Sequence, residues 1–208
     1  MKTQASARHL SRTWQTLLAQ RLSGWTKHRT YGLYRRTEDF VQWVVLDPSI
    51  YDSTLRIHYA VQTLAEQFPT EALTLGDIVR NSQGGELRLS AELPVQDTEQ
   101  ILAAIVGQIA PSVAIPFSAE HVAQFLDTHQ FVHGSAILAR GVAAVILGDT
   151  ESGRNLLKAA FDQYHQMPPI WARALADRIH TWLETEDERM LNQVRRDALV
   201  GAKLLHLK

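Results

Sequence analysis

Hydrophobic residues at the start of the chain recur every three or four positions, at Leu10, Trp14, Leu17, Leu18 and Leu22. This period predicts an amphipathic helix with one buried face. The helix is expected to end at Ser23-Gly24, because glycine tolerates the left-handed backbone that often closes a helix.

Four later segments have the composition or the alternation of β-strands: residues 28–36, 40–46, 55–62 and 86–93. The first two are rich in aromatic and β-branched residues, and residues 37–39 between them suit a hairpin connection. In the other two, hydrophobic and polar residues alternate, which predicts strands with one buried face.

Two helices are predicted after the last of these strands. Asp97 is expected to cap the first, and Ser118 the second, because short polar side chains accept hydrogen bonds from exposed N–H groups at a helix start. Pro111 and Pro116 are expected to bracket a short extended segment between the two helices.

The strand pattern ends at Gly134, and helices are predicted over residues 135–147 and 151–164, from Pro168-Pro169 onward, and around residues 190–202. The first two form an αα-hairpin. We therefore predict an α+β fold with an antiparallel sheet of about four strands and helices on one face, followed by a C-terminal helical bundle. The corresponding domains are residues 1–133 and 134–208.

Composition is that of an ordinary globular protein: 208 residues, 45% hydrophobic and 21% charged, with a net charge of -1. The absence of cysteine excludes disulfides, thiolate metal sites and cysteine nucleophiles. The longest apolar run, Val142–Leu147, is far shorter than the ~18 residues that span a bilayer. The first ten residues lack the apolar stretch of a signal peptide, so we expect a cytoplasmic protein without membrane attachment.

Charge is unevenly distributed, with net values of +5 over residues 1–47, -7 over 48–133 and +1 over 134–208. Such segregation can steer the approach of a partner.

The strongest candidates for a metal or catalytic site are three histidines, His121, His129 and His133, since imidazole is a common metal ligand. His129 and His133 are spaced as on one helical face, but His129 also continues an apolar stripe and no HExxH motif accompanies them. We interpret them as structural or surface residues and predict no metal site and no cofactor. Residues 148–154 (GDTESGR) imitate a phosphate loop but lack its Lys-Ser/Thr ending, so we interpret them as a helix cap and turn.

The segment around residues 27–36 mixes cations and rings, as nucleic-acid platforms do. The candidates are Lys27, Arg29, Tyr31, Arg35 and Arg36. A single strand would send these side chains to both faces of the sheet. This favours an interpretation as charged residues that discourage pairing at a strand edge, over a nucleic-acid-binding surface.

The polar face of the predicted sheet offers Arg56, His58 and Arg88 as candidates for binding a small ligand, provided that this face is covered. A solvated face is the alternative.

Two resemblances add to this pattern. Gly141, Leu147-Gly148-Asp149, Gly153 and Leu157 make residues 139–168 similar to a single tetratricopeptide-type helix pair. The order of Gly24-Trp25, a basic-aromatic strand, FVQWVVL, LRIHYAV and Ile115-Pro116-Phe117 resembles a bacterial family called domain of unknown function 4304. That family has no established catalytic residues, so the resemblance assigns no site.

The leading hypothesis is a non-catalytic protein-interaction module, with an immunity-like role suggested by analogy with such families. We expect a protein partner, and a homodimer is the alternative. A small-ligand-binding protein or an enzyme acting at the polar sheet face is the first alternative. Nucleic-acid binding through residues 27–36 is the second.

Overall fold

The computed structural model describes residues 2–30, 32–49, 52, 54–68, 75–90, 95–113 and 117–208. Contacts divide the chain into two compact units. The first, here called the sheet unit, comprises Met1–Arg35, Gln42–Ala60 and Gly76–Ile115. The second, here called the helical unit, comprises Arg36–Val41, Val61–Leu75 and Pro116–Lys208. This division differs from the predicted boundary at Gly134, because it adds two earlier segments and residues 116–133 to the C-terminal helices.

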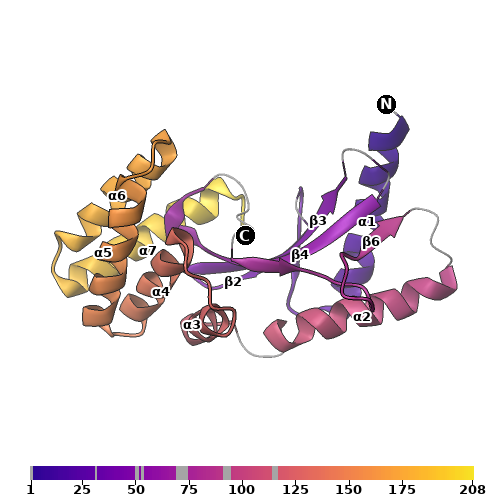
Figure 1. Ribbon diagram of the computed structural model, residues 1–208, viewed down its shortest axis with the longest axis horizontal. Helices are drawn as coiled ribbons and strands as arrows, with labels where there is room; N and C mark the ends of the chain where they lie inside the picture. Colours follow the sequence, from indigo (N-terminus) through magenta and orange to yellow (C-terminus); the bar gives the residue numbers. More distant parts are fainter. Residues whose placement is uncertain are drawn as a thin grey trace. The chain divides into compact units, whose positions relative to one another are not determined.

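The β-sheet has six strands, in the order β1-β2-β3-β4-β5, with β6 also paired to β4. Figure 1 labels β2, β3, β4 and β6 of this sheet. The strands are β1 Thr26–His28, β2 Gly32–Arg36, β3 Phe40–Pro48, β4 Thr54–Thr63, β5 Gly76–Ile78 and β6 Arg88–Ser90. The β1–β2, β4–β5 and β4–β6 pairs are antiparallel. The α+β class and the antiparallel sheet are thus confirmed, with six strands in place of about four.

The predicted strand over residues 28–36 is wrong in detail, because the structure forms two strands there. β1 and β2 make a hairpin in which Thr26 pairs with Tyr34 and His28 with Gly32. Gly32 has a φ of 124°, and a Cβ on it would collide with the Val44 carbonyl oxygen. A glycine is required here because the neighbouring strand approaches so closely.

Further along, β5 was not predicted, because its three residues show no alternation. Strand β6 is shorter than predicted, and the predicted strand residues 91–93 lie outside the described part of the chain.

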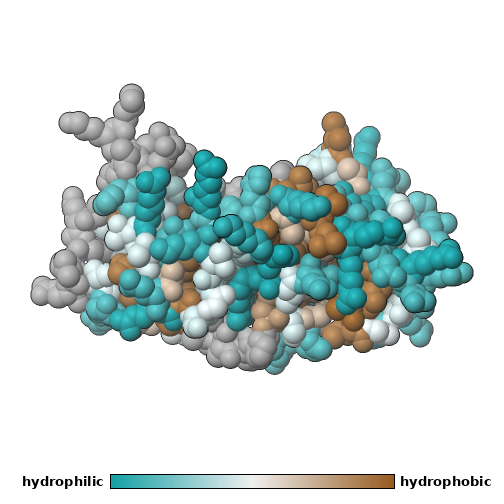
Figure 2. All heavy atoms as spheres, turned by 180° about the vertical axis from the view of Figure 1, so that it is seen from behind, coloured by the Kyte–Doolittle hydropathy of each residue, from teal (hydrophilic) through white to brown (hydrophobic). Residues whose placement is uncertain are grey.

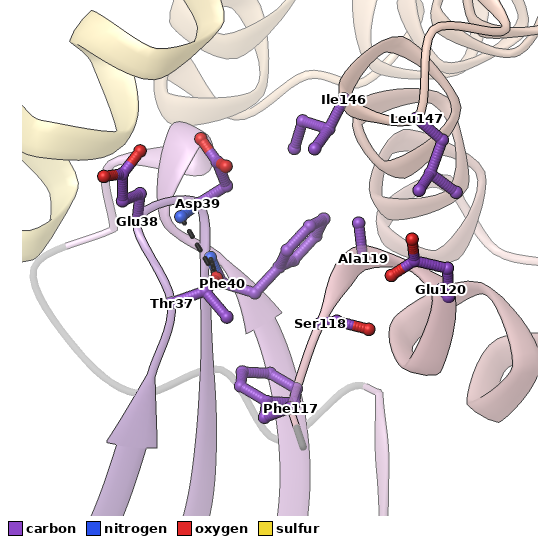
Figure 3. A pocket seen from close by; sticks show the side chains of 10 residues that line it. All are labelled: Thr37, Glu38, Asp39, Phe40, Phe117, Ser118, Ala119, Glu120, Ile146 and Leu147. Atoms are coloured by element: carbon purple, nitrogen blue, oxygen red, sulfur yellow. Dashed lines mark hydrogen bonds between the residues drawn. The ribbon is translucent and has the colours of Figure 1, made fainter. Parts of the chain in front are cut away.

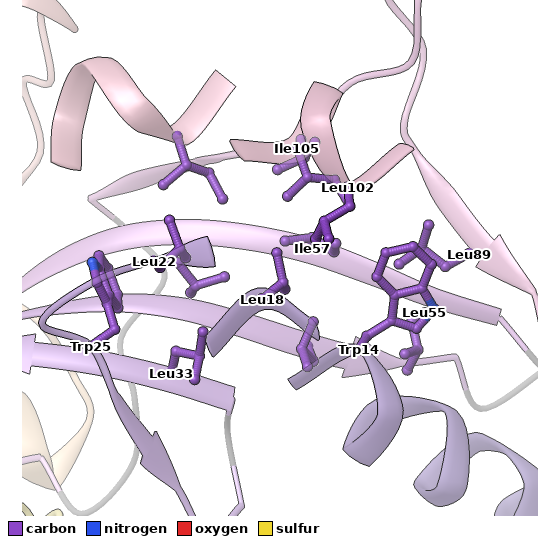
Figure 4. Packing of buried hydrophobic residues seen from close by; sticks show 14 of the residues in the cluster. Trp14, Leu18, Leu22, Trp25, Leu33, Leu55, Ile57, Leu89, Leu102 and Ile105 are labelled. Atoms are coloured by element: carbon purple, nitrogen blue, oxygen red, sulfur yellow. The ribbon is translucent and has the colours of Figure 1, made fainter. Parts of the chain in front are cut away.

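The core of the sheet unit lies on one face of the sheet, where α1 (Lys2–Arg21) and α2 (Val95–Val113) pack (Figure 4). Trp14 and Leu18 of α1 and Ile105 of α2 join Leu55 and Ile57 of β4 in one hydrophobic cluster. Each such side chain contributes about 1.5–3 kcal/mol by burial. The periodicity of the sequence predicted both the helical face of α1 and the alternating face of β4.

Helix α2 differs from its prediction at both ends. It begins at Val95, two residues before the expected cap Asp97, and it runs through Pro111 to Val113. The expected extended segment after Pro111 is therefore wrong over residues 111–113, and residues 114–116 lie outside the described ranges. Proline lacks the N–H that would bond to the carbonyl four residues earlier and so disfavours further helix, and α2 ends two residues after Pro111.

The helical unit contains α3 Ala119–Thr128, α4 Gly134–Ile146, α5 Thr150–His165, α6 Ile170–Leu183, α7 Asp187–Leu204 and the short 3₁₀ helix η1 Leu64–Glu66. The predicted cap of α3 is confirmed, since Ser118 Oγ accepts a hydrogen bond from the His121 N–H. Helices α4 and α5 form the predicted hairpin, in which Gly141 and Gly153 let the two backbones approach. Residues 134–208, all of them described, contain helices and no strand, as predicted.

Within the described residues, no helix is both long enough and apolar enough to cross a bilayer.

Candidate functional site

The three ligand-binding candidates of the sheet face lie together in a network of ion pairs in the sheet unit. Arg56 Nη2 is 2.5 Å from Asp47 Oδ2, and Arg56 Nη1 is 3.7 Å from Glu86 Oε1. His58 Nε2 lies 3.7 Å from the same Asp47 oxygen, and Arg88 Nη2 lies 2.9 Å from Glu86 Oε2. The alternation that selected these residues thus placed them correctly on one face, while their acidic partners come from β3 and from the segment before β6.

Burial lowers the pKa of His58, and the nearby Asp47 carboxylate only partly opposes this effect. At neutral pH His58 is therefore the uncharged member of the network. Both guanidinium groups already face carboxylates, so an anionic ligand would compete with these internal partners. This arrangement favours a structural role, and ligand binding by Arg56, His58 and Arg88 stays a prediction.

The nucleic-acid candidates are held by separate partners. In the sheet unit, Lys27 Nζ donates to Thr16 Oγ1 at 3.1 Å, and Arg35 Nε donates to Gln42 Oε1 at 2.7 Å. The Arg35 guanidinium also lies 5.4 Å from the Trp25 ring centroid. In the helical unit, Arg36 Nε donates to the Lys208 carbonyl at 2.8 Å. Arg29 lies in the turn after β1, and Tyr31 lies outside the described residues.

The three histidines each have a local partner. His121 Nδ1 is 3.1 Å from Ser118 Oγ, and His129 Nδ1 is 2.8 Å from the Phe125 carbonyl. The His133 ring meets Phe131 edge-on, with centroids 5.8 Å apart. Within the described part of the chain, no group of three or more His, Asp or Glu side chains is arranged to hold a metal ion.

Gly148 and Asp149 form the turn and the helix cap that were interpreted from the sequence, and residues 150–154 are the first residues of α5. Gly148 has a φ of 85°, and Asp149 Oδ1 accepts from the Ser152 N–H at 3.2 Å. Arg154, at the end of this segment, donates through Nη1 to the Leu183 carbonyl at 2.8 Å and through Nε to Asp187 Oδ1 at 2.9 Å. These bonds tie α5 to the connection between α6 and α7.

A cleft of about 340 Å³ lies in the helical unit (Figure 3). It is lined by residues 37–39 of the β2–β3 turn, Phe40 at the start of β3, residues 117–120 at the start of α3, and Ile146 and Leu147 at the end of α4. The Phe40 ring points toward Ala119 and Ile146 and is buried, with 1% exposure, so the accessible apolar lining comes from Phe117, Ile146 and Leu147 (Figure 3). The volume is near the lower end of the ~300–1,000 Å³ that small-ligand sites occupy.

Three acidic residues are also among the lining residues of the cleft. Glu38 and Asp39 lie on the turn, with side chains that point away from the Phe40 ring, and Glu120 lies on α3 (Figure 3). Burial raises the pKa of Asp39, and the positive charge of Arg195 partly opposes this shift. A side-chain hydrogen bond with Ser118 lowers the pKa of Glu120, which is exposed, so that this group is charged at neutral pH. Sequence analysis predicted the turn at residues 37–39 and the Ser118 cap, but it gave no sign that the two meet.

A second feature missed in the sequence is Glu66, in η1 of the helical unit. Its side chain is fully buried, and Oε1 has no hydrogen-bond partner among the described residues. Burial raises the pKa of Glu66 to about 8, although Arg178 partly opposes the shift. Glu66 is therefore uncharged at neutral pH.

Comparisons with known proteins found no match to a family model, a curated protein or a solved structure. The resemblances to domain of unknown function 4304 and to a tetratricopeptide hairpin therefore stay predictions.

Proposed function

We propose that this chain is a non-catalytic cytoplasmic protein-interaction module that binds a partner protein through the cleft of its helical unit. The observation that carries the proposal is the cleft itself, in which an aromatic and aliphatic wall is rimmed by charged groups. Protein-binding sites commonly combine an apolar centre with a polar rim. An immunity-like role, in which the partner is a toxin, is one form of this function.

The distribution of exposed hydrophobic side chains supports the same unit as the binding surface. Among the described residues, seven large hydrophobic side chains are exposed, and all belong to the helical unit: Val132, Leu147, Ile170, Trp171, Leu199, Val200 and Leu204. Figure 2 shows one face of the molecule, on which hydrophobic groups lie among mostly hydrophilic residues. Leu147 is the member of this set that lines the cleft.

Selection from a random dodecapeptide library tests the proposal, with the 208-residue chain as bait. Peptides that bind the wild type should bind Leu147→Asp at least tenfold more weakly, because the aspartate places a charge on the apolar wall. Leu199→Asp is the matched control, since Leu199 is similarly exposed on α7 and does not line the cleft.

Retention of peptide binding by Leu199→Asp and its loss in Leu147→Asp would support the cleft. The proposed function would be contradicted if the selection enriched no peptide, or if the enriched peptides bound the wild type and Leu147→Asp equally well.

A further inference from the structure

The outward face of α7 combines aliphatic and basic side chains. The inward face of the helix is buried in the helical unit and consists of Met190, Val194, Ala198, Gly201 and Ala202. On the other side of the helix, Leu199, Val200 and Leu204 are 54%, 43% and 42% exposed. Single exposed hydrophobic residues need no explanation, but three that lie so close together on one helix form a patch.

Two cations lie inside this patch. Arg196 and Lys203 are exposed and stand seven residues apart, so they lie nearly in line along the helix, because about 3.6 residues make one turn. Successive residues are turned by about 100° around the helix axis. Leu199 therefore lies on one side of this line, and Val200 and Leu204 lie on the other. These five residues are here called the α7 face.

The two cations of the α7 face are not neutralised by a carboxylate. Arg196 Nη2 donates to the neutral Gln193 Oε1 at 2.6 Å, and among the described residues neither Arg196 nor Lys203 forms an ion pair. Asp197 follows Arg196 in the sequence, but its carboxylate is turned inward, where it accepts from Trp182 Nε1 at 2.7 Å. The positive charge of the α7 face is therefore open to an anionic partner.

The order of side chains across the α7 face indicates what covers it. A helix that lies on an anionic membrane buries an apolar face and keeps its cations toward the polar side, whereas here the cations lie between the aliphatic residues. A second copy docked through the same face about a twofold axis would bring like charges together, which costs free energy. Single-stranded nucleic acid stacks its bases on aromatic rings, and the α7 face has none.

We infer that the α7 face binds an acidic amphipathic helix of a partner protein. Carboxylates of that helix pair with Arg196 and Lys203, and its aliphatic residues pack on the hydrophobic residues to either side. A helix fits because carboxylates seven residues apart have the same separation of about 10.5 Å along the axis as the two cations. No residue of α7 lines the cleft, so this contact lies beyond the proposed function.

Selection from a library of helical peptides tests this inference, with the 208-residue chain as bait. The peptides have one randomised face and about 20 residues, enough to form a helix on their own. Enriched peptides should carry an excess of Asp and Glu on the randomised face. Arg196→Gln and Lys203→Gln should each weaken their binding by about two- to fivefold, as expected for one exposed ion pair. Added salt should weaken binding to the wild type.

Lys158→Gln is the matched control, because Lys158 is an exposed cation on α5, outside the α7 face. It should leave the affinity unchanged. The inference would be overturned by enriched peptides without an acidic excess, or by equal affinity for the wild type, Arg196→Gln and Lys203→Gln. Peptides that lose affinity only for Leu147→Asp would place the contact at the cleft and would also overturn it.

Two further measurements address the other occupants. Binding of the wild type to vesicles of phosphatidylcholine and phosphatidylglycerol, lost in Arg196→Gln, would assign the α7 face to a lipid surface. A dimer in sedimentation velocity that Leu199→Asp dissociates would assign it to a second copy. Either result would overturn the inference. Because isolated helices shorter than about 12–15 residues are marginal, the dodecapeptide selection judges the cleft and the longer helical library judges the α7 face.

Discussion

Arg178 donates through Nη1 to the main-chain oxygen of Glu66 at 2.9 Å, while the side-chain oxygen Oε1 of Glu66 has no hydrogen-bond partner among the described residues. The arginine thus holds the backbone of η1 against α6, and its charge only partly opposes the effect of burial on the Glu66 carboxyl. The same carboxyl raises the pKa of Tyr164 further, beyond the effect of burial on that phenol. An uncharged Glu66 is compatible with this environment, whereas an ionised one is not.

Stability should therefore fall as pH rises from about 4.5 to about 8. The pKa of Glu66 is raised from 4.5 to about 8 in the folded chain, so the folded state keeps a proton that the unfolded state releases over this range. Because unfolding releases this proton, the free energy of unfolding falls over this pH range by an amount of the order of a few kcal/mol. Urea denaturation at several pH values between 4 and 9 measures the slope.

Glu66→Gln removes the titrating group and should flatten this slope. The variant should gain stability relative to the wild type as pH rises, even if the amide itself costs stability at every pH. Glu188→Gln, in the exposed first turn of α7, is the control and should leave the slope unchanged. Identical slopes for the wild type and Glu66→Gln would show that Glu66 does not titrate as described.

Close packing of η1 on α7 gives a second prediction. A Cβ on Gly201 would collide with the main-chain oxygen of Leu64, so Gly201→Ala should lower the free energy of unfolding by about 1–3 kcal/mol. Gly107→Ala in α2 is the matched control, because no atom beyond its chain neighbours and the nearby backbone of its own helix lies within 4 Å of the added Cβ. It should stabilise the chain by about 0.5–1 kcal/mol through helix propensity. Urea denaturation measures the free energy of unfolding of both variants. A Gly201→Ala variant as stable as the wild type would contradict the close contact between Gly201 and Leu64.

These contacts show why parts of the fold could be predicted and the candidate sites could not. The face of α1, the alternation of β4 and the Ser118 cap depend on neighbouring residues, so local patterns specify them. Strand β5 depends on pairing with β4, and its three residues carry no pattern of their own. Glu66 is buried by helices more than a hundred residues later in the chain, and the cleft joins residues 37–40 to α3 and α4. The local pattern of hydrophobic and polar residues carries no information about such long-range contacts.

Asp47 should control the titration of His58 in the sheet unit. Its carboxylate raises the pKa of His58, against the larger effect of burial. Asp47→Asn should therefore lower the His58 pKa further, which NMR titration of the imidazole protons can follow. Asp127→Asn, which removes the partner of Arg140 in the helical unit, is the control and should leave His58 unchanged. An unchanged His58 pKa in Asp47→Asn would mean that the two side chains do not interact in solution.

Arg154 distinguishes the structural interpretation of residues 148–154 from phosphate binding. Its guanidinium donates to the Leu183 and Thr185 carbonyls and to Asp187, a set of acceptors that one lysine ammonium cannot match in geometry. Arg154→Lys should lower the free energy of unfolding by about 1–3 kcal/mol. Arg173→Lys, on an exposed position of α6, should change stability by less than about 0.5 kcal/mol. Added inorganic phosphate should leave the melting temperature of the wild type unchanged at constant ionic strength. A phosphate-dependent rise that Arg154→Lys abolishes would contradict the structural role, because it would require the guanidinium to bind the anion as well as the three acceptors.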